Sequence, residues 1–168
     1  MPCSRIPPAL KPPGHAAISL ALGGGTWLFT GSPGSLVVAL LVGVFLDLDH
    51  LLDYYRWLIL DQTHRLLLFL HSYELLIPAL FISYTSHWNP LAIAGTLALL
   101  GHLLTDQLTN QVRPMGYFFT YRALNSFRTS AMTAPKSRRR MYWDLIRLPL
   151  MPRILPPTIA LLKKLSRR

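Results

Sequence analysis

Four long apolar stretches, separated by short polar connections, dominate the chain. They cover approximately residues 15–30, 35–53, 66–84 and 90–109. A helix needs about 20 residues to cross the hydrocarbon core of a membrane. The second, third and fourth stretches are close to that length, and the first is shorter. Pro33-Gly34 and Asn89-Pro90 mark turns between neighbouring stretches. The pattern predicts an all-α fold, an integral membrane bundle of about four transmembrane helices.

Ionisable side chains lie inside or at the ends of these stretches, where burial is costly and usually functional. The first stretch carries them at its start, the second at its end, the third near its start and the fourth near its end. If the stretches cross a membrane in turn, all these ends lie on the same side. The nine side chains are His15, Asp47, Asp49, His50, Asp53, His71, Glu74, His102 and Asp106.

Carboxylates and imidazoles together form the ligand set of a hard or borderline divalent metal ion. We therefore expect a metal site made of His15, Asp47, Asp49, His50, His71, His102 and Asp106. Zn²⁺ is the expected ion, with Mn²⁺ or Mg²⁺ as alternatives, and the number of candidates allows one or two ions per chain. His87 lies beside Tyr84 and Trp88 at the opposite side, in an aromatic-belt setting, and is excluded from the site.

Helical spacing predicts which of these residues share a face. Asp49 and Asp53, four apart, fall on one side of the second helix, and His71 and Glu74, three apart, on one side of the third. Glu74 is the expected general base, because it neighbours His71 and need not bind the metal, and Asp53 is the second catalytic candidate. Asp47, although counted with the metal site, is expected mainly to orient the ligands, as is Asp53.

Positive charge predicts the orientation of the bundle. Lys and Arg precede the first stretch, lie between the second and third, and follow the fourth, while loops 31–34 and 85–89 contain none. Loops rich in Lys and Arg stay on the cytoplasmic side. We therefore expect a protein integral to the cytoplasmic (inner) membrane, with both termini in the cytoplasm. A cleaved signal peptide is the alternative for the N-terminus, and it would remove His15.

The charge also divides the chain into two parts. Residues 1–112 carry four Lys or Arg and six Asp or Glu, whereas residues 113–168 carry thirteen and one. The first part is the expected transmembrane domain, and the second a basic, proline-containing cytoplasmic or interfacial tail. Basic clusters beside apolar residues predict contact between this tail and anionic lipid head groups. Nucleic acid is not an expected partner, because no folded reader motif is recognisable.

Several short motifs occur in order between residues 12 and 120. They are Gly14-His15, DLDH from Asp47, HRLLLFLHSYE from His64, and GHLLTDQLTN from Gly101 with VRPMGYFF after it. In these motifs the chain resembles the YdjM-like membrane-bound metal-dependent hydrolases. The resemblance implies an integral inner-membrane hydrolase, without naming a substrate. Leu46 stands where that family has proline, and a long gap between His64 and His71 leaves His64 undecided as a ligand.

The expected function is metal-dependent hydrolysis at the cytoplasmic membrane surface, on a phosphoester or lipid-like substrate. The alternative is a metal-binding membrane protein or ion transporter that performs no chemistry, although an ion path needs polar groups through the full depth of the membrane. A purely structural or partner-binding protein would leave the polar cluster unexplained. Lipid phosphatases of the PAP2 type share Gly14-His15 and His102, but the Lys and Arg residues of their phosphate clamp are missing.

Overall fold

Helices make up all the regular structure that the computed structural model describes, which covers residues 12–60, 62, 64–110 and 112–133. Two isolated bridges, Arg65 with Arg128 and Val112 with Thr133, join extended residues in this part of the chain. The prediction of an all-α fold is confirmed. The elements are α1 (Pro12–Thr30), α2 (Gly34–Phe45), η1 (Leu46–Asp49), α3 (His50–Leu58), η2 (Tyr73–Leu75), α4 (Leu76–Thr85), α5 (Pro90–Thr109), η3 (Pro114–Tyr117), α6 (Phe119–Leu124) and α7 (Thr129–Met132).

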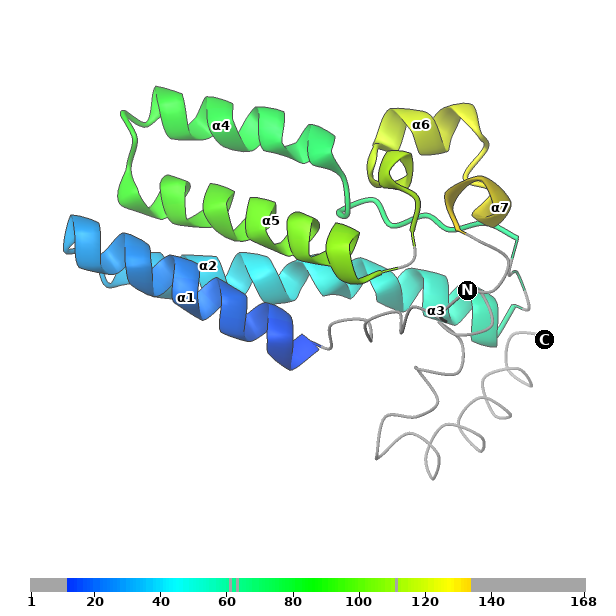
Figure 1. Cartoon of the computed structure of the whole chain (residues 1–168), viewed down its shortest axis with the longest axis horizontal. Helices are drawn as coiled ribbons and strands as arrows, with labels where there is room; N and C mark the ends of the chain where they lie inside the picture. The colour runs from blue at the N-terminus through cyan, green and yellow to red at the C-terminus, as the bar shows by residue number, and fades with distance from the viewer. Residues whose placement is uncertain (1–11, 61, 63, 111, 134–168) are drawn as a thin grey trace, which may run out of the picture.

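Helices α1, α2 and α5 pack against one another, and α4 pairs with α5 on its other side (Figure 1). The 3-10 turn η1 joins α2 to α3, so these elements form one long rod. Asn89 begins α5 by accepting a hydrogen bond from the Leu91 amide, and Pro90 takes the first helical position. The short helices α6 and α7 lie near the start of α4 and the end of α5 (Figure 1). The start of α1 lies toward this same end of the bundle.

Small residues let α1 and α2 approach closely. A Cβ atom on Gly43 would lie 1.8 Å from Ser19 Oγ, and one on Gly23 would lie 2.7 Å from the Cβ of Ala39. Neither glycine has room for a side chain. Close backbone approach through small residues is typical of helices that pack inside a membrane, where apolar burial between helices contributes little.

Replacing Gly43 with alanine should lower the free energy of unfolding by about 1–3 kcal/mol, because the added methyl group forces α1 and α2 apart. The matched control is Gly25→Ala, since no atom of the described residues lies within 4 Å of a Cβ on Gly25. The control should be neutral or stabilising by up to about 1 kcal/mol through helix propensity. Thermal unfolding of purified protein, followed by circular dichroism, measures both. Equal stability of the two variants would contradict the close α1–α2 contact.

The third apolar stretch is shorter as a helix than predicted. The prediction of a helical face that contains both His71 and Glu74 is wrong, because helical structure begins only at Tyr73. Backbone amides before this point are bound by carboxylates from the rod, so they cannot form helical hydrogen bonds: Leu67 and Leu68 donate to Asp53. The segment from residue 64 to 72 is instead a loop, called here the His71 loop.

Two helical stretches among the described residues are long and apolar enough to cross a membrane, judged by length and composition. They are Gly34–Asp53 and Pro90–Thr109, while Tyr73–Thr85 is apolar but shorter. The folded unit also extends past the predicted boundary at residue 112. The side chains of Tyr117, Arg122 and Met132 are buried. The predicted lipid-binding clusters at 136–140 and 158–168 lie outside the described residues.

Candidate metal centre

Seven of the nine ionisable side chains singled out in the sequence converge at one end of the bundle. Six of them lie in helices or the 3-10 turn η1, and His71 lies in the loop that bears its name. They are His15 at the start of α1, Asp47 and Asp49 in η1, His50 at the start of α3, His71 in the His71 loop, and His102 and Asp106 near the end of α5. The structure thus brings the polar ends of these chain segments together at one end of the bundle.

Two histidines and two aspartates form the middle of this cluster. His71 Nε2 lies 3.1 Å from His102 Nε2 and 3.3 Å from Asp106 Oδ2. Asp47 Oδ1 lies 3.6 Å from His71 Nε2 and 3.5 Å from His102 Nε2. Ligand atoms held at about 2.0–2.1 Å around a tetrahedral zinc ion lie roughly 3.3 Å from one another. The spacing of these four side chains therefore suits a small divalent cation.

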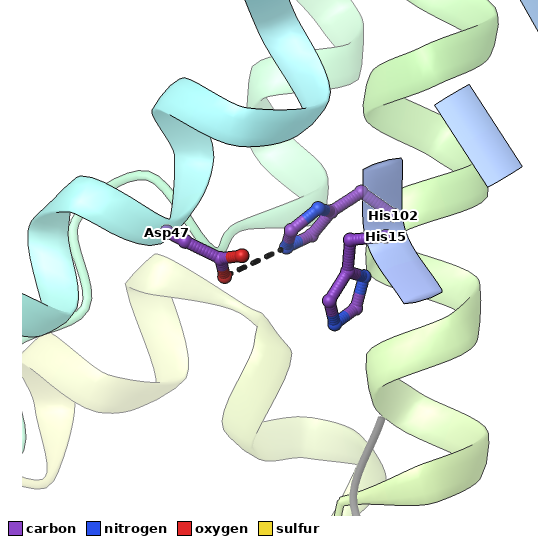
Figure 2. A group of neighbouring side chains, drawn as sticks. All are labelled: His15, Asp47 and His102. Atoms are coloured by element: carbon purple, nitrogen blue, oxygen red, sulfur yellow. Dashed lines mark ion pairs between the residues drawn. The ribbon is translucent and has the colours of Figure 1, made fainter. Parts of the chain in front are cut away.

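His15 closes one side of the cluster. Its Nε2 atom lies 3.1 Å from Asp106 Oδ1, and its ring stacks on that of His102 with centroids 4.1 Å apart. Figure 2 shows these two rings together, with the Asp47 carboxylate directed toward His102. The Nδ1 atoms of His15 and His102 are buried and find no hydrogen-bond partner among the described residues. A buried nitrogen without a partner is costly.

Asp49 and His50 close the other side. Asp49 Oδ1 lies 3.0 Å from His71 Nδ1 and 3.3 Å from His50 Nδ1. A carboxylate on the far nitrogen of a metal-binding imidazole fixes its tautomer and its orientation. The side chains of Asp47 and His50 keep 26% and 17% of their surface exposed, so this edge of the cluster is open to water.

The cluster offers overlapping ligand sets. Three groups of side chains each bring their ligand atoms within 4.8 Å of one another: His15 with Asp47 and His102, Asp47 with His50 and His71, and His71 with His102 and Asp106. The groups share members, so the described residues can hold one ion, or two ions that share ligands. The expectation of one or two ions per chain stays a prediction.

Asp53 holds the His71 loop in place. Its carboxylate is buried and accepts hydrogen bonds from the amides of Leu67 at 3.0 Å and Leu68 at 3.1 Å. It belongs to none of the three ligand groups. These contacts favour a structural role for Asp53, which positions His71 through the loop, over the catalytic role expected from the sequence.

Glu74 also lies outside the ligand groups. Its carboxylate accepts hydrogen bonds from the amides of Phe119 and Thr120, both at 2.9 Å, and from the hydroxyl groups of Ser72 and Thr120. The carboxylate thereby binds the first amides of α6, where negative charge is favourable. These contacts favour an anchoring role for Glu74 over the general-base role expected from its spacing to His71.

Two buried residues from beyond position 112 adjoin the cluster and were missed in the sequence. Burial and the negative charge of Asp106 raise the pKa of Tyr117, whose hydroxyl accepts a hydrogen bond from Asn110. Burial lowers the pKa of Arg122, whose Nη1 donates to the carbonyl oxygen of Leu68. Tyr117 lies within the VRPMGYFF segment noted in the sequence but was not assigned a role, and no sequence pattern marks Arg122, whose guanidinium contacts the His71 loop only in the folded chain.

Neither of the two remaining histidines belongs to the cluster. His64 is exposed, and it lines a separate pocket with Arg65, Ser126, Arg128 and Ser130. His87 is exposed in the turn between α4 and α5, at the other end of the bundle. The exclusion of His87 agrees with its position, and the undecided His64 is placed outside the candidate metal centre.

Comparison with protein-family models, curated proteins and solved structures gave no match. The geometry of the cluster therefore carries the functional conclusion.

Proposed function

We propose that the chain is an integral membrane, metal-dependent hydrolase that acts at the cytoplasmic surface of the membrane. One observation carries the proposal: ligand atoms of His71, His102, Asp47 and Asp106 converge at separations of 3.1–3.8 Å. Three of these side chains are almost fully buried. Buried carboxylates and imidazoles in such numbers are costly unless a cation compensates them.

The distribution of apolar side chains supports the membrane location. Besides the two long apolar helices, many large hydrophobic side chains on α1, α2, α4 and α5 are exposed. Examples are Leu28, Phe29, Ile77, Phe81 and Leu108. Large exposed apolar surfaces mark contact with lipid or with another protein. The distribution of Lys and Arg along the sequence supports a cytoplasmic location for the metal centre.

The donor chemistry favours Zn²⁺ or Mn²⁺ over Mg²⁺. Four imidazoles and three carboxylates surround the centre, and Mg²⁺ prefers an all-oxygen octahedral shell that includes several waters. A bound divalent ion supplies Lewis acidity and lowers the pKa of coordinated water toward ~7.

The protein side chains then have distinct tasks. His71, His102 and Asp106 hold the ion, with His15 on the far side of Asp106. Asp49 orients His71 through its Nδ1 atom. His50 and Asp47 stand at the open edge, where an imidazole can accept a proton from an attacking water. The resemblance to the YdjM-like hydrolases supports the same class of reaction.

Metal-loaded protein should hydrolyse a simple phosphoester such as p-nitrophenyl phosphate, and a chelator should abolish the rate. Asp106→Asn should lower the rate at least about 100-fold, because Asp106 contacts three histidines of the centre. Replacing a residue that only orients a metal ligand already costs about 10–100-fold. His87→Ala, at the opposite end, is the control and should keep the wild-type rate. A preparation with bound metal but no turnover on phosphoesters or other hydrolysable lipids would favour the metal-binding or transport alternative.

A further inference from the structure

Arg122 is a buried guanidinium with one edge, formed by Nε and Nη2, that has no hydrogen-bond partner among the described residues. It lies in α6 with 1% of its surface exposed. Its Nη1 atom donates to the carbonyl oxygen of Leu68, whereas Nε and Nη2 find no hydrogen-bond partner in the part of the chain that the structure describes. A buried charge without a partner is strongly unfavourable. Nε and Nη2 therefore lack, among the described residues, the partner that a buried guanidinium needs.

The carboxylates with an electrostatic effect on Arg122 already have other partners. Asp49, Glu74 and Asp53 are the acidic groups that act on Arg122. Asp49 contacts two histidines and the Leu70 amide, while Asp53 and Glu74 each bind backbone amides. No ion pair within 4.0 Å joins Arg122 to any of them among the described residues. The described residues thus leave the Nε–Nη2 edge without an anion.

Arg122 is attached to the backbone of the His71 loop through one shared acceptor. The carbonyl oxygen of Leu68 accepts from Arg122 Nη1 and also from the backbone amide of His71, at 3.3 Å. Arg122 is thus linked to the backbone of a central ligand through a single carbonyl group. The Nε–H and Nη2–H groups point in parallel from one edge, and this fork binds the oxygens of a carboxylate or phosphate in pairs.

We propose that Arg122 binds a phosphoryl group of the substrate beside the metal centre. The inference rests on the proposed function and assigns its substrate class: a phosphoester, from a lipid head group or from a soluble molecule. A phosphoryl group that pairs two oxygens with the guanidinium keeps a further oxygen for the centre at His71 and His102, whereas a carboxylate has none left. Arg122 of α6 would thereby provide a positively charged phosphate-binding group, which the sequence motifs lack.

Inorganic phosphate binding to zinc-loaded protein tests this role, measured by isothermal titration calorimetry with zinc content determined on the same samples. Arg122→Gln removes the charge, and Arg122→Lys keeps the charge but loses the fork. Both should bind phosphate at least about tenfold more weakly, as expected when charge-assisted hydrogen bonds are lost, and both should keep wild-type zinc content. The control is Arg128→Gln, an exposed arginine of the separate pocket, which should leave phosphate affinity unchanged.

Glycerol phosphate and micelles containing phosphatidic acid form two further arms, which separate a soluble source from a lipid source, and acetate tests a carboxylate. Unchanged phosphate affinity in both Arg122 variants with normal zinc content would overturn the proposal. Loss of zinc and of helical circular dichroism in both variants would also overturn it, because Arg122 would then only fix the His71 loop. A wild type without zinc would instead refute the metal centre. In that case, phosphate binding to the metal-free protein that Arg122→Gln abolishes would still support the anion site.

Discussion

Replacing His71 with alanine should lower the affinity for a divalent metal by at least about 100-fold, the largest loss expected from any single change in the cluster. His71 belongs to two of the three ligand groups, and its Nε2 atom faces both His102 and Asp106. Replacing a residue that only hydrogen-bonds to a metal ligand typically lowers metal affinity about 10–100-fold. Loss of a central ligand should therefore lower it further. Competition with a chromogenic chelator measures the affinity.

The matched control for this variant is His64→Ala. His64 begins the same loop but is exposed and outside the cluster, so its replacement should leave metal affinity unchanged. Circular dichroism of both variants shows whether the helices are retained. Equal metal affinity of His71→Ala and the wild type would show that His71 is not a ligand. It would also contradict the ligand group of His71, His102 and Asp106.

Asp53→Ala should lower the free energy of unfolding by about 2–5 kcal/mol. The substitution leaves the amides of Leu67 and Leu68 without an acceptor, and each unsatisfied buried group costs about 1–3 kcal/mol. Asp53→Asn keeps one carbonyl acceptor and should lose less. Chemical denaturation of the three proteins gives the values.

The same pair of variants separates a structural role for Asp53 from a catalytic one. If Asp53 anchors the loop, hydrolysis by Asp53→Asn should fall only as far as metal binding falls. An Asp53→Asn protein with normal stability and normal metal content but no turnover would contradict the anchoring role. The catalytic role expected from the sequence would then be correct.

The one-sidedness of the cluster is predictable from the sequence for a simple reason. Successive helices in a bundle run in opposite directions, so polar groups at a start, an end, a start and an end meet on one side. His15, Asp47, His102 and Asp106 follow this rule and converge as expected. Spacing within α5 also places His102 and Asp106 one turn apart, with both side chains buried.

The His71 loop shows where local pattern fails. The apolar pattern of residues 66–70 predicts the start of a helix. The backbone amides of Leu67 and Leu70 instead donate to the carboxylates of Asp53 and Asp49. These long-range hydrogen bonds override local preference and are invisible to periodicity. Glu74 was assigned to the face of His71 because a continuous helix was assumed, and without that helix its carboxylate reaches α6 instead.

Arg122 could not be recognised for a different reason. It is one of thirteen Lys and Arg residues after position 112, and nothing in its neighbourhood distinguishes it from its exposed counterparts. Only the packing of α6 over the His71 loop buries it. The prediction of a tail beginning at residue 113 treated these charges as a single class, whereas the folded part of this region contributes to the surroundings of the site.

The central claim is that the cluster binds a divalent metal, and metal analysis of the purified wild-type protein by plasma mass spectrometry tests it most directly. Protein prepared without added chelator should carry one or two equivalents of zinc or manganese per chain. The double variant His71→Ala/His102→Ala, prepared in the same way, should carry none, while His87→Ala should match the wild type. A wild type with no more metal than the double variant would contradict the account.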